Sequence, residues 1–210
     1  LSSPSTRGYC GVQGAAPVRL RAALESWRRE RRALRKEELH SAYGLMGSGA
    51  PVWVEPDRYA DGGSGAIVLY HRNETSIYEN TLKHQDMASW IGEGKDPLLH
   101  RTFGIRLSGS GFTCEGKDVL VSEEGKRHLL SAHLHCTQTD TAEAWIGALE
   151  GVAQQDTKPY EESLAAHRRW WQEWRNRSWI HIENDEAGKV NQAYALQRYI
   201  TACAGRGEFP

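Results

Sequence analysis

The sequence predicts a mainly β fold, in which an antiparallel, sandwich-like part is followed by helices. In the first two thirds of the chain, short apolar segments are separated by turn sequences such as DGGSG (residues 61–65). A helical period replaces them from about residue 139. The stretch 163–182, SLAAHRRWWQEWRNRSWIHI, holds four of the eight tryptophans. No regular alternation of strands and helices is present, so we expect antiparallel rather than βαβ topology.

Composition narrows the class of protein. The chain has 210 residues, which suffice for one sizeable domain or two small ones, and it is 39% hydrophobic and 25% charged, as in globular proteins. Its net charge of −1 gives no reason to expect nucleic acid or an anionic membrane as a partner. No apolar run approaches the ~20 residues of a transmembrane helix, and no signal peptide is visible.

The first part of the chain is predicted from alternation and turn residues. Residues 1–17 are rich in Ser, Pro and Gly and are expected to be irregular. Apolar and polar residues then alternate, which predicts a strand over 18–28. The charged run 28–38 is typical of a solvated loop or a short helix, and a helical turn is expected over 37–43.

The remaining strands follow the same signals. The polar tract 71–87 is expected to form a loop or a short, irregular helix. A GSG sequence after residue 108 predicts a hairpin between two of the strands. The predicted strands are 51–55, 66–70, 100–108, 111–115, 118–122 and 127–137.

Helices are predicted from residue 139 onward. Thr139 or Thr141 is expected to cap a helix that extends to about residue 154. Pro159 suits the first turn of the tryptophan-rich helix, after which WIHI (179–182) predicts a short strand. A last helix is expected over 189–204. Its predicted apolar face comprises Val190, Ala193, Tyr194, Ile200 and Cys203.

The tryptophan-rich helix is predicted to be a structural joint between two parts of the chain. Leu164 shares a helical face with several aromatic residues, and little but another body can cover so much apolar surface. Stacking of the indoles on sugar rings is the functional alternative. The residues assigned to the interdomain role are His167, Trp170, Trp171, Trp174 and Trp179.

The densest polar cluster follows the strand 66–70. His71, Arg72, Asn73 and Glu74 are candidate substrate-binding residues, because loops on rigid scaffolds often carry sites and these side chains suit sugar hydroxyls. The alternative interpretation is a network at the end of a strand that ties down the next segment.

A second candidate pair is His133 and His135, which lie two apart and on a strand would share one face, as two metal ligands can. No third ligand is evident, so solvated polar residues are the alternative and no metal or cofactor is predicted. The chain has no nucleophile elbow, Walker-type loop or HExxH motif, and no catalytic residue is assigned.

Several motifs resemble those of two-domain glycoside hydrolases. NQAYALQRYITACAGRGEFP (191–210) is similar to the opening helix of the (α/α)6 barrel in glycoside hydrolase family 95, the α-L-fucosidase and α-galactosidase group. The linker HRRWWQEWRNRSWIHI (167–182) resembles the corresponding linker. LYHRNETSIYENTLKHQDM (69–87) and DPLLHRTFGIRLSG (96–109) are similar to a bacterial family of predicted glycosidases, whose N-terminal β-domain is known as a domain of unknown function. The similarity covers residues 18–210.

The resemblance implies an architecture and a role. It implies part of a β-supersandwich over 1–138, a helical linker over 139–183 and the first helix of an (α/α)6 barrel over 184–210. The family's general acid and base lie in the barrel, so none is carried onto this chain. We therefore expect an inactive, N-terminal fragment of a secreted or periplasmic bacterial glycoside hydrolase. Its expected partners are a carbohydrate substrate and the remaining barrel domain.

Two rival hypotheses remain. One is a stand-alone carbohydrate-binding module that uses Trp53, Trp90 or the loop after residue 70. The other is a small metal-dependent sandwich enzyme that uses His133 and His135.

Overall fold

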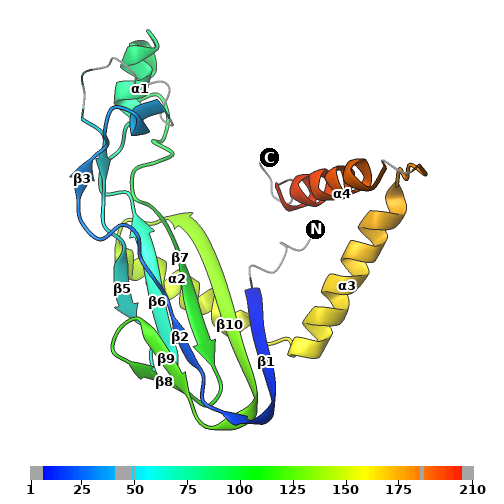
Figure 1. Cartoon of the computed structure of the whole chain (residues 1–210). Helices are drawn as coiled ribbons and strands as arrows, with labels where there is room; N and C mark the ends of the chain where they lie inside the picture. The colour runs from blue at the N-terminus through cyan, green and yellow to red at the C-terminus, as the bar shows by residue number, and fades with distance from the viewer. Residues whose placement is uncertain (1–6, 41–48, 50, 185–186, 205–210) are drawn as a thin grey trace. The chain divides into compact units, whose positions relative to one another are not determined.

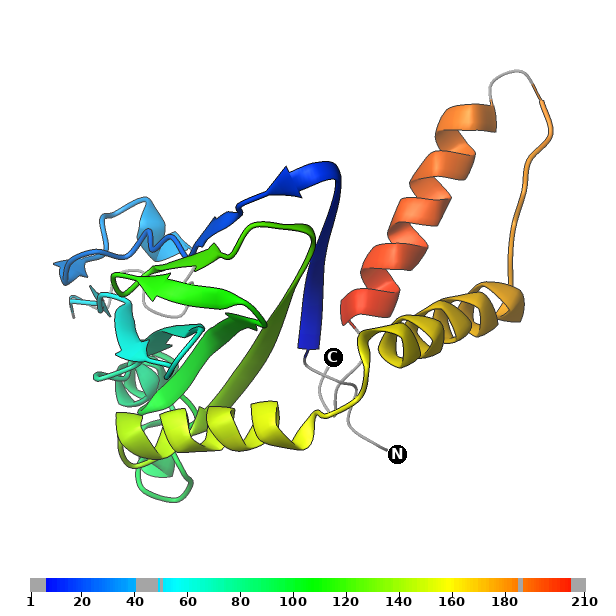
Figure 2. The ribbon, with the colours of Figure 1, turned by 90° about the horizontal axis from the view of Figure 1, so that it is seen from below.

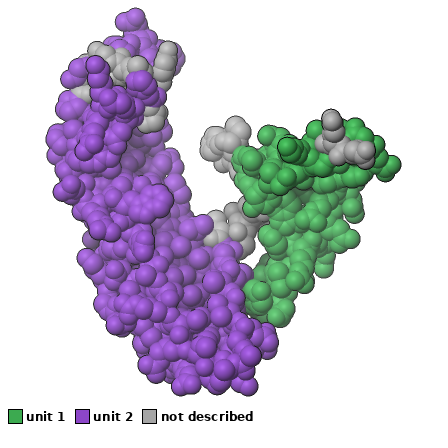
Figure 3. Space-filling view, viewed as in Figure 1, with its two compact units in different colours: residues 1–5, 157–210 green, residues 6–156 purple. Residues whose placement is uncertain are grey.

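The computed structural model describes residues 7–40, 49, 51–184 and 187–204. The described residues form two compact units, one over residues 7–156 and one from residue 157 onward (Figure 3). The fold is mixed, with antiparallel sheets in the N-terminal part and helices after them. This confirms the predicted order of sheets and then helices. No barrel forms within the described ranges.

A five-stranded antiparallel sheet is the centre of the first unit (Figure 1). Its order is β1-β10-β7-β6-β5, so the short strand β5 and the Gly-rich strand β1 form its edges. The strands are β1 (Arg7–Val18), β5 (Arg58–Asp61), β6 (Ala66–Arg72), β7 (Arg101–Gly109) and β10 (Gly125–Gln138).

Strand β6 shows why both faces of this sheet are covered. Its side chains alternate between the faces. Val68 and Tyr70 pack with Trp145 and Leu149 of α2 (Ala142–Gln155), which lies along one face of the sheet (Figure 2). Ile67 faces the opposite way and joins a second core. Since β6 is nearly all buried, its apolar run AIVLY is explained by packing on two sides.

The second core lies between the large sheet and a three-stranded sheet. Phe112 and Leu120 of the small sheet pack against Ile67 and Leu130 of the large one. Leu20, Ala22 and Leu24 also contact this core, as the alternation in 18–28 predicts. The small sheet has the order β2-β9-β8, with β2 (Arg21–Ala23), β8 (Phe112–Glu115) and β9 (Val119–Ser122). A further pair is β3 (Arg32–Ala33) and β4 (Trp53–Val54).

Helix α2 begins at a side-chain cap. The Thr141 hydroxyl accepts a hydrogen bond from the Ala144 amide at 3.1 Å, as expected for an N-cap residue. Trp145 and Leu149 of this helix are fully buried. The polar tract after β6 contains the predicted short helix, α1 (Tyr78–His84), followed by a single 3-10 turn, η2 (Ala88–Trp90).

The second unit consists of α3 (Tyr160–Arg177) and α4 (Ala187–Ala204). Pro159 immediately precedes α3, and α4 covers the helix predicted at 189–204. None of the helices in the described ranges is long and apolar enough to span a membrane.

Three predictions about strands are wrong. Residues 7–17, expected to be irregular, belong to β1, because an edge strand needs only the backbone of β10 for pairing. The expected 100–115 hairpin does not form, since β7 pairs with β6 and β10 whereas β8 pairs with β9. WIHI is not a strand, because residues 179–182 pair with no described strand.

Other expectations hold in part. The strand predicted over 18–28 shortens to β2, and the one at 51–55 shortens to two residues. The charged run 28–38 is mostly exposed, but it contains β3. Residues 38–40 form a 3-10 turn, and residues 41–43 of the helical turn predicted at 37–43 lie outside the described residues.

Candidate functional site

The predicted polar cluster lies where β6 ends. His71 and Arg72 are the last two residues of the strand, whereas Asn73 and Glu74 follow it. His71 lies on the same face as Ile67, away from α2, because side chains alternate along a strand. Arg72 lies on the opposite face. The four residues are thus close in sequence but divide between two environments.

Arg72 is tied down by four acceptors. Its exposed fraction is 5%, and its Nη1 donates to the His100 carbonyl and to Thr102 Oγ1 at 3.1 and 3.0 Å. Its Nη2 donates to the carbonyls of Thr139 and Asp140 at 3.0 and 2.9 Å. A guanidinium with these partners fixes the chain before α2 and has little left to offer a ligand. For Arg72 the geometry favours the alternative of a structural network.

Asn73 and Glu74 also contact their own neighbourhood. Asn73 Nδ2 donates to the Leu98 carbonyl at 3.0 Å, and its backbone amide bonds to Arg101. Glu74 pairs with Arg58 Nη2 at 3.0 Å. Asn73 therefore holds the start of β7, while the partly exposed Glu74 remains accessible to solvent.

His71 belongs to a different arrangement. Its Nδ1 lies 3.0 Å from Asp57 Oδ1, and both side chains are about nine-tenths buried. Arg28 Nε donates to the same Asp57 oxygen at 2.7 Å. The same Arg28 N–H also lies 3.1 Å from His71 Nδ1. Because its bond to the carboxylate is the shorter one, we assign the Nδ1 proton of His71 to the bond with Asp57. This tautomer leaves Nε2 with a lone pair, and Nε2 has no partner among the described residues.

The electrostatics keep His71 neutral. Burial lowers the pKa of His71, and the Arg28 charge lowers it further, while Asp57 opposes both effects. Phe103 lies beside the imidazole, with ring centroids 5.3 Å apart. A neutral imidazole oriented by a carboxylate can accept a proton or a hydrogen bond from a hydroxyl group at Nε2.

Residues of β4 and the loop after it extend this arrangement. Arg31 Nε donates to Glu55 Oε1 at 2.8 Å, and its guanidinium lies 4.0 Å from the centre of the Trp53 ring. Glu55 is buried, whereas Trp53 is 39% exposed. The Glu55 charge also acts to raise the pKa of His71, in the same direction as Asp57. We define the His71 cluster by six residues: Arg28, Arg31, Trp53, Glu55, Asp57 and His71.

Sequence reasoning identified only part of this cluster. Trp53 was singled out as an exposed aromatic residue, but the carboxylates and arginines were not. A signal was present: acidic residues at 55 and 57 directly follow a short strand, and the arginine-rich run 28–32 precedes it.

His133 and His135 do lie on one face, as predicted, but it is the face that α2 covers. His133 is 4% exposed and lies directly between Arg7 and Arg106 on the neighbouring strands. His135 stacks on Trp145, with centroids 6.3 Å apart. The interpretation as solvated residues is wrong for His133, whereas His135 is half-buried. Burial lowers the pKa of both imidazoles. Two flanking guanidinium groups also disfavour a metal cation at His133.

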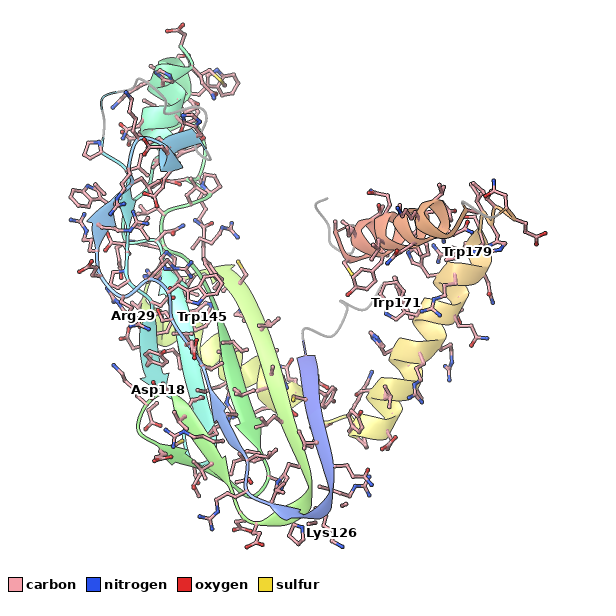
Figure 4. All side chains as sticks on the ribbon, in the orientation of Figure 1. Arg29, Asp118, Lys126, Trp145, Trp171 and Trp179 are labelled. Carbon is pink, nitrogen blue, oxygen red and sulfur yellow. The ribbon has the colours of Figure 1, made fainter. Side chains whose placement is uncertain are left out.

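The tryptophan-rich helix packs on α4. Trp171 lies on α3 (Figure 4) and stacks on Tyr199, with centroids 5.4 Å apart, and Trp179 meets Tyr194 edge-on at 5.6 Å. His167 and Trp170 both contact Trp171. Trp170, Trp171 and Trp174 are half-buried and Trp179 is 52% exposed. The expected interdomain role of these residues stays a prediction.

Arg198 of α4 closes the contact between the two helices. Its Nη2 donates to the Trp174 carbonyl at 3.1 Å, and its Nη1 to Ser178 Oγ at 2.6 Å. Its guanidinium lies 3.9 Å from the centre of the Trp174 ring. A cavity of about 430 Å³ opens beside this contact, lined by Trp174, Arg175, Asn176, Trp179, Ala195, Arg198 and Tyr199.

These observations define a protein with a two-sheet antiparallel domain, a polar cluster at one strand end, and an aromatic helix pair. Residues 9–180 match the N-terminal model of the family described as a domain of unknown function (DUF5703), and the chain belongs to that family. This confirms the part of the resemblance that concerned such a domain. No curated protein and no solved structure matches the chain.

Proposed function

We propose that the chain serves a glycoside hydrolase as its supporting β-domain, and that α4 packs with further helices into a catalytic barrel of the family 95 type. Helix α4 carries this proposal because it is apolar on two sides. Tyr194, Ala195 and Ala202 lie on the side that meets α3 and are half-buried or buried. Away from α3, Leu196, Ile200 and Cys203 form a stripe at spacings of four and three, and all three are exposed.

A helix with apolar residues on two opposite sides needs more than one partner to cover them. Leu196 and Ile200 are each more than half exposed in the described structure. Such a stripe is typical of a helix that other helices cover. The same helix carries the resemblance to a first barrel helix, which also implies a glycan substrate and a secreted or periplasmic location.

The test compares two proteins. We expect the full product of the gene to hydrolyse members of a panel of aryl glycosides, and the pure 210-residue chain to hydrolyse none. In the full product, Ile200→Glu is expected to lower turnover and thermal stability, because the stripe would be buried there. Gln197→Glu, which adds the same charge at an exposed polar position of the same helix, is the control. pH-dependent turnover by the pure 210-residue chain would overturn the proposal.

A second candidate function is carbohydrate binding by the His71 cluster. It combines an exposed indole with carboxylates, guanidinium groups and a neutral imidazole, which are the groups that hold hydroxyl-rich ligands. Titration with glycans is expected to change the tryptophan fluorescence of the chain. Trp53→Phe should remove the change, whereas Trp90→Phe, 59% exposed in η2, should keep it. A response that follows Trp90 instead would reject the cluster as the site.

A further inference from the structure

A second polar site lies on the other face of the large sheet. A cavity of about 280 Å³ opens between α2 and the sheet, and it is lined by Gly62, Arg106, Glu150, Ala153 and Gln154. Arg106 lies on the α2 face, since it pairs in register with Val68. The cavity is therefore on the opposite side of the sheet from His71, and it is independent of the function proposed above.

The sheet beneath the cavity carries a row of cationic and polar side chains. Arg7, His133 and Arg106 are direct neighbours across β1, β10 and β7. In the next row, Ser131 accepts from Arg7 Nη2 at 3.0 Å and Ser108 accepts from Arg106 Nη1 at 2.9 Å. The two serines are themselves paired in register. Both guanidinium groups are thus held in fixed positions on either side of His133.

Two groups in this row lack hydrogen-bond partners within the part of the chain that the structure describes. Neither ring nitrogen of His133 is bonded, although the residue is 4% exposed, and Arg106 Nε is buried and unbonded. No described carboxylate lies within salt-bridge distance of Arg106. Buried polar groups of native proteins nearly always have partners, so unmet groups beside a cavity point to a ligand.

The charges select the kind of ligand. Arg106 and Glu150 line the cavity with opposite signs, and Gln154 offers both a donor and an acceptor. Glu150 repels an oxyanion and Arg106 repels a metal cation. A neutral molecule with several hydroxyl groups can donate to Glu150 and accept from Arg106 and Gln154. The volume is close to the lower limit of about 300 Å³ for small-molecule sites.

We propose that this cavity binds a neutral, hydroxyl-rich ligand of monosaccharide size. The test is an NMR titration of the chain with methyl glycosides, followed at the imidazole nitrogens of His133, which is the cross-strand neighbour of the lining residue Arg106. Concentrations up to about 50 mM are needed, because a ligand this small binds weakly. A saturable shift of the His133 signals is the expected result. No shift with any sugar, or a shift with inorganic phosphate alone, would overturn the proposal.

Two variants assign the binding to the cavity. Gln154→Leu changes an exposed residue of α2 that lines the cavity, so the fold is preserved and binding should weaken about fivefold through a lost hydrogen bond. Gln155→Leu makes the same change at an exposed neighbour that does not line it, and binding should be unchanged. Arg106→Met is expected to abolish the shift. Equal binding by the Gln154 and Gln155 variants would place the ligand elsewhere.

Discussion

Gly104 of β7 lies directly beneath the indole of Trp145. A Cβ atom at position 104 would come within 2.7 Å of Trp145 Cη2 and equally close to Tyr70 Cβ. Trp145 is fully buried against the sheet (Figure 4), and its ring also contacts Tyr70 at 5.4 Å. Because residue 104 has no side chain, Trp145 of α2 can pack directly on the sheet at this position.

Gly104→Ala is therefore expected to destabilise the first unit. The added methyl group must displace Trp145 or the backbone of β6, and overpacking of this kind costs roughly 1–3 kcal/mol. Urea unfolding followed by tryptophan fluorescence measures the change. The control is Gly147→Ala in α2, where nothing lies within 4 Å of the new methyl group. A helical alanine should stabilise by up to about 1 kcal/mol, so the two variants should shift the midpoint in opposite directions.

Arg72→Lys tests whether the end of β6 is a structural network. A lysine keeps the charge but cannot reach four acceptors in two directions. Because several buried carbonyl groups would lose their donor, the free energy of unfolding should fall by roughly 2–4 kcal/mol. The side chain of Arg58 is 49% exposed and pairs with Glu74. Arg58→Lys should therefore change the free energy of unfolding by less than about 1 kcal/mol. Similar effects of the two substitutions would contradict the structural role of Arg72.

The buried histidines predict a pH dependence of stability. Burial lowers the pKa of His71, His133 and His135 below the ordinary value of about 6.5. The unfolded chain therefore binds more protons than the folded one just below that pH, and the free energy of unfolding must fall as the pH falls. Above about pH 7 both states are neutral at these residues, and the contribution is constant.

Urea midpoints between about pH 5.5 and 8 measure this slope, which is at most ~1.4 kcal/mol per pH unit for each histidine. His133→Asn should reduce the slope, since it removes one of the three groups. His84→Asn, an exposed position at the end of α1, should leave it unchanged. A slope that is the same in both variants would show that His133 does not titrate on unfolding.

The elements that the sequence predicts well are those with strong side-chain patterns. β6 and β10 carry apolar or alternating residues, and α2 carries a cap and two core positions one turn apart, Trp145 and Leu149. β1 was missed because its stability comes from pairing with β10, not from its own residues. The hairpin between β7 and β8 was wrongly predicted for the same reason. The two strands belong to different sheets, and the packing between those sheets determines which strands they pair with.

The candidate site was predicted only in part, because its contacts join residues that are far apart in the sequence. The polar sequence at the end of β6 makes His71 and Arg72 equal candidates. Because side chains alternate along the strand, His71 contacts Asp57, whereas Arg72 bonds to the chain before α2. Asp57 and Arg28 lie 14 and 43 positions from His71 in sequence. No local pattern could bring them together, because the fold of the intervening strands places them.

Arg198→Lys tests the contact that joins α3 and α4. The arginine holds the Trp174 carbonyl and Ser178 Oγ, which closes the C-terminal end of α3, where backbone acceptors lack helical partners. A lysine keeps the charge near this end but loses at least one bond and the stacking on Trp174. Backbone amides of α4 should then exchange with deuterium about tenfold faster, as a loss of ~1.4 kcal/mol in local stability requires.

Hydrogen exchange read by mass spectrometry over α4 peptides measures this effect. Arg175→Lys is the matched control, since Arg175 is an exposed arginine in the last turn of α3 with no resolved bond to α4. Its variant should exchange like the parent chain. Peptides of β6 and β10 should be unaffected in both variants, because their cores are formed within the first unit. If α4 exchanges at the parent rate in Arg198→Lys, the helix pair is held by the Trp171–Tyr199 stack without this arginine.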